Sequence, residues 1–312
     1  MAKPLLTGII SYPVTPFAPD GGLDLDALRR LADDLVTAGS HGIAPLGSTG
    51  ESAYLTEAEW DAVCETTLDA VAGRVPTVVG VAHFSTRGTV RRARVAARHG
   101  ATAIMVLPQV YWRLTDAELA RHFAAVAEAS DLPVMLYNNP ATSGVDLPPR
   151  AVAALARAIP NLTMVKESSG DATRFRALRE LSDGALSVYN GSNPLALDAF
   201  RSGAVGWCTA APNLAPRACR DLYEAATGGQ PERADAMWAN LLPLLKLIVS
   251  HGLPRTIKAG LELRGRGVGQ PRPPLLPLPP SETEQLRHAL ERLGVHPLLS
   301  RTDATPAPGL TV

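Results

Sequence analysis

The sequence has few cysteines, and their positions exclude two kinds of cross-linked domain. Among 312 residues there are only three, Cys64, Cys208 and Cys219, and no two of them form a Cys-x-x-Cys pair. This pattern encodes neither a disulfide framework nor a zinc ribbon. We therefore expect a protein of a reducing compartment, and the cytoplasm is the simplest location. A chain of this length can bury a substantial core without covalent cross-links.

Net charge and long apolar runs are also missing. The 30 basic and 30 acidic side chains cancel, and the basic residues are scattered, so no nucleic-acid-binding surface is indicated. The longest apolar run, residues 241–249, contains Lys246 and is far shorter than the roughly 20 residues that cross a bilayer. The N-terminal apolar stretch is interrupted by Pro13 and Pro16, which is not typical of a signal peptide. The sequence thus predicts neither a nucleic-acid nor a membrane partner.

Lysine is the scarcest of the charged residues. The chain has 26 arginines but only four lysines, Lys3, Lys166, Lys246 and Lys258. Arginine stays charged in proteins, whereas a lysine amine can lose its proton when it is buried. A chain that uses arginine for nearly every positive charge is expected to keep lysine where the chemistry of an amine is needed.

Short apolar runs rich in β-branched residues alternate along the chain with longer segments of helical period. This alternation predicts strand–helix units and a parallel sheet. The eight predicted strands are residues 8–14, 42–46, 77–81, 103–107, 134–138, 163–166, 186–189 and 204–208. The eight helices that follow them are residues 25–38, 57–71, 89–99, 116–129, 149–158, 172–181, 194–201 and 216–226. Eight such units in about 225 residues favour a closed (β/α)8 TIM barrel of the α/β class over an open sheet.

The pattern changes to helices alone after the eighth unit. Helices are expected at residues 232–250, 255–263 and 282–293, with a proline-rich bridge at 271–280. We therefore predict a barrel carrying the active site at residues 1–228 and a C-terminal helical region at 229–296. Residues 297–312 are rich in Pro, Thr and Ala and are predicted to be a disordered tail. The helical region shows no evident chemistry and is expected to pack against the barrel or a neighbouring subunit.

Lys166 ends the sixth predicted strand, and barrel enzymes hold their reacting groups at the carboxyl ends of strands. It follows the mostly apolar residues 163–165, where an ammonium is expensive to desolvate. An amine with a lowered pKa at this position could form a Schiff base with a carbonyl substrate. The position of Lys166 and the scarcity of lysine fit two ordinary interpretations equally well. Lys166 could form an ion pair, or it could extend its ammonium group to solvent.

Three groups of hydroxyl-bearing residues are expected at the same end of the barrel. Ser48 and Thr49, in a glycine-flanked loop after the second strand, offer hydroxyl and backbone N–H groups suited to a carboxylate. Tyr111 and Tyr137 belong to the fourth and fifth units, and a phenol can both donate and accept a proton. Taken alone, the glycine-flanked loop fits an ordinary turn, and each tyrosine fits a core residue. Together with Lys166 they predict imine chemistry on a 2-oxo acid.

Other site types are not supported. The seven histidines show no His-Glu-x-x-His or paired spacing, so no metal site is expected. Ser48 does not lie in a Gly-x-Ser-x-Gly turn, which disfavours a hydrolase. The glycines at 265–269 follow a predicted helix and precede the proline-rich bridge, so they do not indicate a dinucleotide loop. Glu167 lies on the opposite strand face from Lys166 and is expected to tie the barrel wall to a helix.

The polar residues at the predicted strand ends resemble those of the dihydrodipicolinate synthase and N-acetylneuraminate lyase family, the class I pyruvate-dependent aldolases. The resemblance extends from Thr7 to the last predicted helix. It rests on four separated motifs in the same order, at residues 47–51, 137–144, 165–171 and 189–191. The family is built on a TIM barrel, and its members are commonly homodimers or homotetramers.

The resemblance implies a role for each matching residue. Lys166 would form the imine with pyruvate or a similar 2-oxo acid, and Tyr137, Ser48 and Tyr111 would relay protons. In some members the residue corresponding to Tyr111 is supplied across a dimer contact. Thr49, with the backbone of Ser48, would hold the substrate carboxylate. No cofactor or metal is implied, because the protonated imine is the electron sink. The other expected substrate-binding residues are Gly47, Thr142, Gly191 and Cys208.

The motif after the fifth strand departs from the family pattern. In the lysine-pathway synthases an arginine there holds the carboxylate of the second substrate, whereas this chain has Thr142. We therefore favour aldol cleavage, condensation or dehydration of a hydroxylated or sugar-derived 2-oxo acid. One alternative is 4-hydroxy-tetrahydrodipicolinate synthase, which joins pyruvate to aspartate semialdehyde, with Arg113 as a replacement cation. An alternative of another class is a barrel that binds a 2-oxo acid without turning it over.

Overall fold

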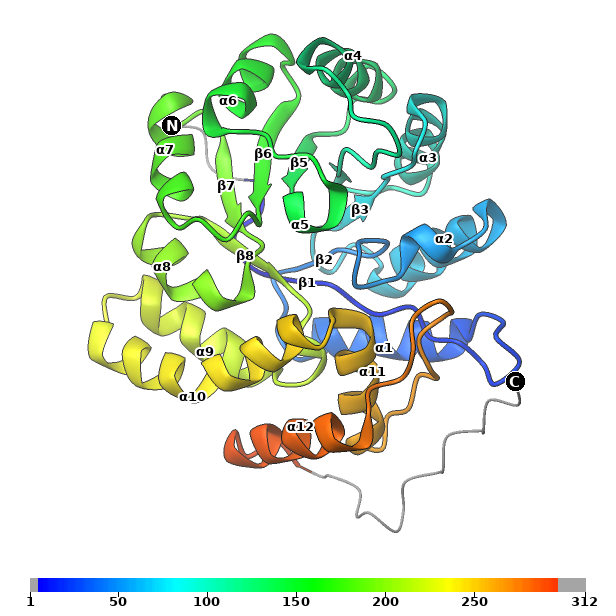
Figure 1. The fold of residues 1–312 in the computed structure, drawn as a ribbon, viewed down its shortest axis with the longest axis vertical. Helices are drawn as coiled ribbons and strands as arrows, with labels where there is room; N and C mark the ends of the chain where they lie inside the picture. Colours follow the sequence, from blue (N-terminus) through cyan, green and yellow to red (C-terminus); the bar gives the residue numbers. More distant parts are fainter. Residues whose placement is uncertain (1–4, 297–312) are drawn as a thin grey trace.

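Eight parallel strands form one sheet with helices around it in the computed structural model, which describes residues 5–296 (Figure 1). The strand order is β2-β1-β8-β7-β6-β5-β4-β3. The two end strands meet through a parallel bridge between Ile43 and Thr77. The Ile43 N–H donates to the Pro76 carbonyl at 3.0 Å, and the Gly80 N–H donates to the Pro45 carbonyl at 3.0 Å. The sheet is therefore a nearly closed barrel, and the predicted (β/α)8 fold is confirmed.

The elements follow the predicted order. The strands are β1 (Gly8–Ser11), β2 (Gly42–Ile43), β3 (Val78–Gly80), β4 (Ala103–Val106), β5 (Val134–Asn138), β6 (Leu162–Glu167), β7 (Ser187–Asn190) and β8 (Gly206–Thr209). The helices of the barrel are α1 (Leu25–Thr37), α2 (Glu57–Val71), α3 (Thr86–Arg98), α4 (Asp116–Ala127), α5 (Pro140–Ser143), α6 (Pro149–Ala158), α7 (Thr173–Leu181), α8 (Ala196–Arg201) and α9 (Pro216–Thr227). Three C-terminal helices follow, α10 (Pro231–Ser250), α11 (Leu253–Leu263) and α12 (Pro280–Arg292). Short 3-10 turns are η1 (Ser52–Tyr54), η2 (Asn193–Leu195) and η3 (Ala211–Asn213).

The largest differences from the prediction lie at the carboxyl end of the barrel, where β1 ends at Ser11 instead of residue 14. Strand β2 has two residues instead of five, although the Ala44 N–H still donates to the Ser11 carbonyl at 2.8 Å. Leu46, at the end of the predicted strand, adopts a left-handed conformation with φ of 62°. A short helix, α5, begins at Pro140 where no helix was predicted. The predicted tail at 297–312 lies outside the described residues.

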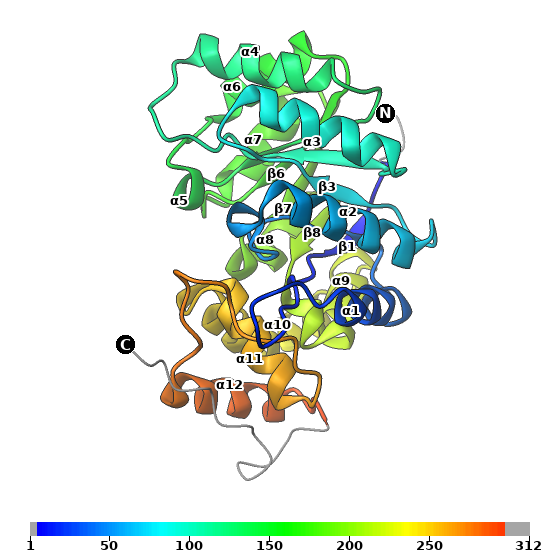
Figure 2. The same ribbon diagram turned by 90° about the vertical axis from the view of Figure 1, so that its right-hand side faces the viewer.

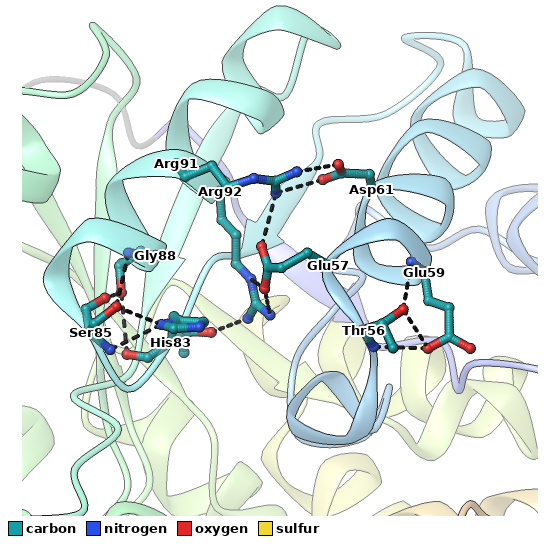
Figure 3. Close-up of polar contacts among 11 residues, drawn as sticks. Thr56, Glu57, Glu59, Asp61, His83, Ser85, Gly88, Arg91 and Arg92 are labelled. Atoms are coloured by element: carbon teal, nitrogen blue, oxygen red, sulfur yellow. Dashed lines mark hydrogen bonds and ion pairs between the residues drawn. The ribbon is translucent and has the colours of Figure 1, made fainter.

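Side-chain caps explain why two of the outer helices begin where the sequence predicted. Thr56 Oγ1 accepts a hydrogen bond from the Glu59 N–H at 3.3 Å, and the Glu59 carboxylate accepts one from the Thr56 N–H at 2.8 Å. Thr115 and Glu118 form the same reciprocal pair at the start of α4. These capping boxes satisfy backbone donors that a helix leaves free at its first turn. Figure 3 shows the box at Thr56.

Charged pairs hold α3 against α2, as Figure 3 shows. Arg91 donates to both carboxylate oxygens of Asp61, and Arg92 donates to Glu57 Oε1 at 2.6 Å. The Arg92 side chain is buried and lies over the ring of Trp60, 5.2 Å from its centre. A buried guanidinium needs such partners because desolvating an unpaired charge is costly.

The hydrophobic core has two layers separated by the sheet. Side chains that point into the barrel pack with one another, as Ile10, Met105 and Met164 do. Neighbouring residues on the same strands, such as Val165, pack outward against the helices. Because side chains alternate along a strand, Lys166 and Met164 lie on the inner face of β6, whereas Glu167 lies on its outer face. Lys166 and Glu167 therefore lie on opposite faces, as predicted.

The C-terminal helices lie together beside α1 and α9, as both ribbon views show (Figures 1 and 2). They share a buried apolar cluster with those two helices, to which α10 contributes Leu244 and Ile248, α11 contributes Ile257 and α12 contributes Leu290. The expected packing against the barrel is therefore present. None of the helices among residues 5–296 is long and apolar enough to span a membrane.

Candidate active site

A cavity of about 250 Å³ opens at the carboxyl ends of β2 to β5. Its wall is mostly apolar, and the described residues that line it come from β3 to β5, from the loops after β2 to β4, from α5 and from the C-terminal region. They are Leu46, Gly47, Ser48, Glu51, Ser52, Ala53, Tyr54, Gly80, Ala82, Met105, Leu107, Gln109, Tyr137, Thr142, Pro254 and Leu275. Four of the predicted site residues thus meet in one space: Gly47, Ser48, Tyr137 and Thr142. This is the end of the barrel at which the chemistry was expected.

Lys166 lies between two tyrosine rings next to this cavity. Its side chain is 4% exposed, and Nζ is 3.8 Å from the centre of the Tyr137 ring and 4.0 Å from that of Tyr12. In the strand register Tyr137 and Tyr189 are its neighbours on either side. None of the ion pairs in the described part of the chain involves Lys166. The two ordinary explanations, an ion-paired lysine and a snorkelling lysine, therefore do not apply.

The two phenols beside Lys166 have opposite pKa shifts. Burial raises the pKa of Tyr12 well above its ordinary value, and the neighbouring Cys208 raises it further. Burial acts on the pKa of Tyr137 in the same direction, but the Lys166 charge and hydrogen bonds from Asn139, Ser48 and Lys166 outweigh it, so this pKa is lowered. Tyr137 is therefore the phenol suited to giving and taking a proton, whereas Tyr12 stays protonated and donates to Met105 Sδ at 3.1 Å.

Asn139 is a site residue that the sequence reasoning did not single out. Its Nδ2 donates a hydrogen bond to the Tyr137 hydroxyl oxygen at 2.7 Å. A donor to this oxygen stabilises the phenolate more than the phenol. The signal was present in the Tyr137-Asn138-Asn139-Pro140 motif, but nothing in the sequence says that this amide turns back toward the preceding tyrosine.

Replacing Asn139 with leucine is expected to raise the pKa of Tyr137, because the phenolate loses a donor. Titration of tyrosinate absorbance measures this, with the Tyr137 transition identified by its loss in Tyr137→Phe. Thr142→Ala, which alters the same cavity without removing a hydrogen bond to the phenol, is the control and is expected to leave the transition in place. An unchanged titration in Asn139→Leu would show that the amide does not act on the phenol.

The loop after β2 is held in an unusual backbone conformation. Leu46 and Glu51 both have left-handed φ, at 62° and 54°, a conformation that costs free energy in residues other than glycine. A Cβ on Gly80 would lie 2.3 Å from the Leu46 carbonyl oxygen, so only glycine fits there. The Thr15 hydroxyl donates to the Gly50 carbonyl at 2.6 Å. The loop is therefore fixed from several sides, as expected of a functional segment.

Ser48 and Thr49 take different positions in this loop. Ser48 is exposed, lines the cavity and hydrogen bonds to Tyr137. Thr49 is 2% exposed. A Cβ on Gly47 would lie 2.9 Å from the ring of Tyr12, which explains the glycine before Ser48. Of the two hydroxyls, that of Ser48 is directly open to a ligand in the cavity.

Two further predicted substrate-binding residues contact Lys166 or its neighbours. A Cβ on Gly191 would lie 2.6 Å from Lys166 Cε and 2.0 Å from Ser168 Oγ, so Gly191 makes room for the lysine side chain. Cys208 is 2% exposed inside the barrel, hydrogen bonds to Tyr12 and does not line the cavity. Burial raises the pKa of its thiol. Cys208 packs with Tyr12 inside the barrel, within reach of the Lys166 charge, and this differs from the expected substrate contact.

Tyr111 does not join the other predicted residues within one chain. Its side chain is 92% exposed and does not line the cavity, and the adjacent Trp112 is 78% exposed. Both lie in the segment between β4 and α4. The single chain therefore supplies two of the three expected members of the proton relay, Tyr137 and Ser48.

Glu167 is a buried residue of the barrel wall, but its hydrogen bonds join β6 to β5 and to the loop after β6, whereas a contact with a helix was predicted. It is 1% exposed, and its carboxylate accepts hydrogen bonds from Asn138 Nδ2 at 3.1 Å and the Ser169 N–H at 2.6 Å. Burial raises the pKa of this carboxyl group. Among residues 5–296, no group of three or more His, Cys, Asp or Glu side chains is placed to hold a metal ion.

Comparisons with known proteins agree with the motifs. The sequence model of the dihydrodipicolinate synthetase family matches residues 5–293. A 4-hydroxy-tetrahydrodipicolinate synthase of Xanthomonas axonopodis pv. citri is 40% identical, with 88% of this chain and 90% of the relative covered. That of Synechococcus sp. is 37% identical, with 92% and 94% covered. Among solved structures, a Pseudomonas aeruginosa protein described as a candidate dihydrodipicolinate synthetase is 52% identical, with a TM-score of 0.91 and 92% and 99% covered.

Proposed function

Because the chain belongs to the dihydrodipicolinate synthetase family, whose members are pyruvate-dependent Schiff-base lyases, we propose that it joins pyruvate to an aldehyde through an imine on Lys166. The observation that carries this proposal is the buried Lys166 amine between two phenol rings, without a carboxylate partner among the described residues. The curated relatives are named 4-hydroxy-tetrahydrodipicolinate synthase. They favour the reaction of pyruvate with aspartate semialdehyde over the sugar-acid substrate that the sequence analysis preferred.

The residues of the proposed reaction lie at the carboxyl end of the barrel and act one after another. The neutral amine of Lys166 attacks the pyruvate ketone, water leaves, and a protonated imine forms. The adjacent methyl carbon then loses a proton to give an enamine, whose carbon attacks the aldehyde. Tyr137 and Ser48, which hydrogen bond to each other, carry protons to and from the ketone oxygen. The backbone N–H groups of the Ser48–Thr49 segment hold the pyruvate carboxylate, because the Thr49 side chain is buried and does not line the cavity. The protonated imine accepts the electrons, so we propose that no metal or cofactor is needed.

A second copy of the chain completes the proposed relay. Tyr111, together with Trp112 and Phe84, presents exposed aromatic surface next to the cavity loops, and such surface marks protein contacts. We propose a homodimer or homotetramer in which Tyr111 reaches the partner's cavity. One solved relative is described as the first monomeric dihydrodipicolinate synthase variant, which implies that assembly is the more common state among such enzymes.

One observation favours a second candidate, a lyase for hydroxylated or sugar-derived 2-oxo acids. No arginine lines the cavity in the described part of the chain, and Thr142 stands at the position of the expected carboxylate anchor. A second substrate without its own carboxylate would suit this wall better. The two candidates share the imine and differ only in the aldehyde. Pyruvate consumption with aspartate semialdehyde, compared with pyruvate release from a panel of 2-oxo sugar acids, separates them.

Thr142→Arg is expected to change the preference for the aldehyde. A guanidinium at this place would form charge-assisted hydrogen bonds to a carboxylate, so kcat/KM with aspartate semialdehyde should rise about tenfold. With an uncharged aldehyde it should stay constant or fall. Thr142→Gln, similar in reach but uncharged, is the control. Equal effects of Thr142→Arg on both aldehydes would show that the second substrate does not bind against α5.

A further inference from the structure

Lys258 is the second lysine of the described chain that is almost completely buried. It lies on α11, and its Nζ is 2.8 Å from Glu51 Oε1, with side-chain exposures of 1% and 0%. Nζ also donates to the Gln270 carbonyl at 3.0 Å and lies 4.1 Å from the centre of the Phe17 ring. The C-terminal region thus places a positive charge inside the molecule, against the loop after β2.

Arg272 encloses the same carboxylate from another side. Its backbone N–H donates to Glu51 Oε2 at 2.7 Å. Its guanidinium donates to both oxygens of Glu59 at 2.8 Å and lies 4.2 Å from the centre of the Phe17 ring. Hydrogen bonds from Arg272 lower the pKa of Glu59 to about 2. We call Glu51, Lys258, Gln270 and Arg272 the Lys258 network.

The network acts on a segment that has to be held in place. Glu51 has a left-handed φ of 54° and follows Ser48 by three residues. The Glu51 N–H donates to the Ser48 carbonyl at 3.2 Å, and the Gly50 N–H donates to the Gly47 carbonyl at 3.1 Å. A strained backbone conformation of this kind persists only where several contacts with the surrounding residues hold it in place. A shift of Glu51 would be transmitted directly to Ser48.

Stability alone is a weak reason for this ion pair. Desolvation of two charges offsets much of their attraction, and apolar residues of similar volume often replace a buried pair without loss. Arginine supplies nearly all other positive charges of the chain. A lysine at this place therefore indicates a requirement beyond a positive charge. Glu51 also lines the cavity, so the pair lies at the wall of the site and not in the remote core.

We propose that Lys258 is a positioning residue, whose charge holds Glu51 and through it the Ser48–Thr49 segment in the geometry that binds the pyruvate carboxylate. This inference rests on the proposed function. It assigns a catalytic purpose to the C-terminal helical region, for which the sequence showed none. Residues of α11 and of the segment before α12 complete the substrate loop of the barrel.

The acid–base behaviour of Lys258 provides a test on the unmodified protein. Burial lowers the pKa of Lys258 to about 8, the charge of Glu51 opposes this shift, and the charge of Arg272 adds to it. Glu59, paired with Arg272, is the next charged group behind the network. The ammonium is present below about pH 8 and is lost as the pH rises through that value. The KM for pyruvate is therefore expected to rise above this pH.

The decisive experiment compares Lys258→Met, Glu51→Gln and the double variant. Both single variants are expected to raise the KM for pyruvate about tenfold with a much smaller change in kcat, since a weakened contact to a carboxylate affects binding. Borohydride trapping at saturating pyruvate should still label Lys166. The double variant, which leaves no unpaired charge, should recover part of the lost affinity. Arg266→Met, which breaks the exposed pair with Asp34 in the same region, is the control with unchanged KM.

The outcomes separate this inference from the proposed function. A lower melting temperature with an unchanged KM in Lys258→Met, and a wild-type KM that is constant through pH 8, would overturn the positioning role. If Lys258→Met does not fold, the wild-type pH profile and Glu51→Gln decide. Absence of trapping in the wild-type protein would instead contradict the imine on which the proposed function depends.

Discussion

Lys166→Arg is expected to abolish turnover and borohydride trapping together. Arginine keeps the positive charge and most of the length of the side chain, but its guanidinium stays protonated and cannot form an imine with a ketone. Loss of covalent catalysis should lower kcat/KM by about 10⁴-fold or more. Steady-state assays with pyruvate and the best aldehyde measure the loss, and intact mass after reduction measures the missing adduct.

The matched control for this variant is Lys246→Arg. Lys246 is exposed on α10, and the same chemical change there is expected to leave activity as it was. Melting temperature and circular dichroism establish that Lys166→Arg folds, and Lys166→Met provides a second variant that adds no bulk. Substantial turnover in both folded variants would show that the amine of Lys166 is not the nucleophile.

Tyr137→Phe is expected to lower kcat by about 10²- to 10³-fold, within the range that general acid–base catalysis contributes. The phenyl ring would keep its contact with Lys166 Nζ, so the fold and the lysine environment should persist. Only the hydroxyl that connects Ser48 and Asn139 is lost. The rate of imine trapping should fall along with kcat, because formation of the imine itself requires proton transfer.

Tyr189→Phe is the matched control for the loss of a phenol. Tyr189 is also buried in the barrel, but its hydroxyl donates to the Leu6 carbonyl at 2.9 Å and not to a site residue. Its removal should cost about 1 kcal/mol of stability with kcat close to that of the wild-type protein. Equal losses of kcat in the two variants would argue that barrel packing, and not the relay, explains the effect at Tyr137.

The barrel and the buried position of Lys166 could be predicted from sequence because periodicity, composition and place in a strand indicate them. Alternating strand and helix periods indicated the (β/α)8 fold, and the preference for arginine made Lys166 conspicuous at a strand end. The alternation of side chains along one strand also separated Lys166 from Glu167 correctly. None of these inferences depends on a contact between residues far apart in the chain.

The contacts that could not be predicted join segments far apart in the sequence. Tyr12, the residue after β1, lies beside Lys166, and Lys258 lies against Glu51, because the barrel closes and α11 packs onto it. Cys208 lies within β8, yet its side chain packs inside the barrel and does not line the cavity. Tyr111 is exposed in the single chain. Its proposed contact is with a second copy of the chain, and the residues of such a contact cannot be read from one sequence.

Treatment of the wild-type protein with pyruvate and borohydride, followed by intact mass and peptide mapping, tests the central claim most directly. Reduction fixes an imine irreversibly, so the site of attachment is read from the modified peptide. We expect one reduced pyruvyl group per chain, located on Lys166. A protein that stays unlabelled, or that carries the adduct on Lys258, Lys246 or another amine, would contradict it.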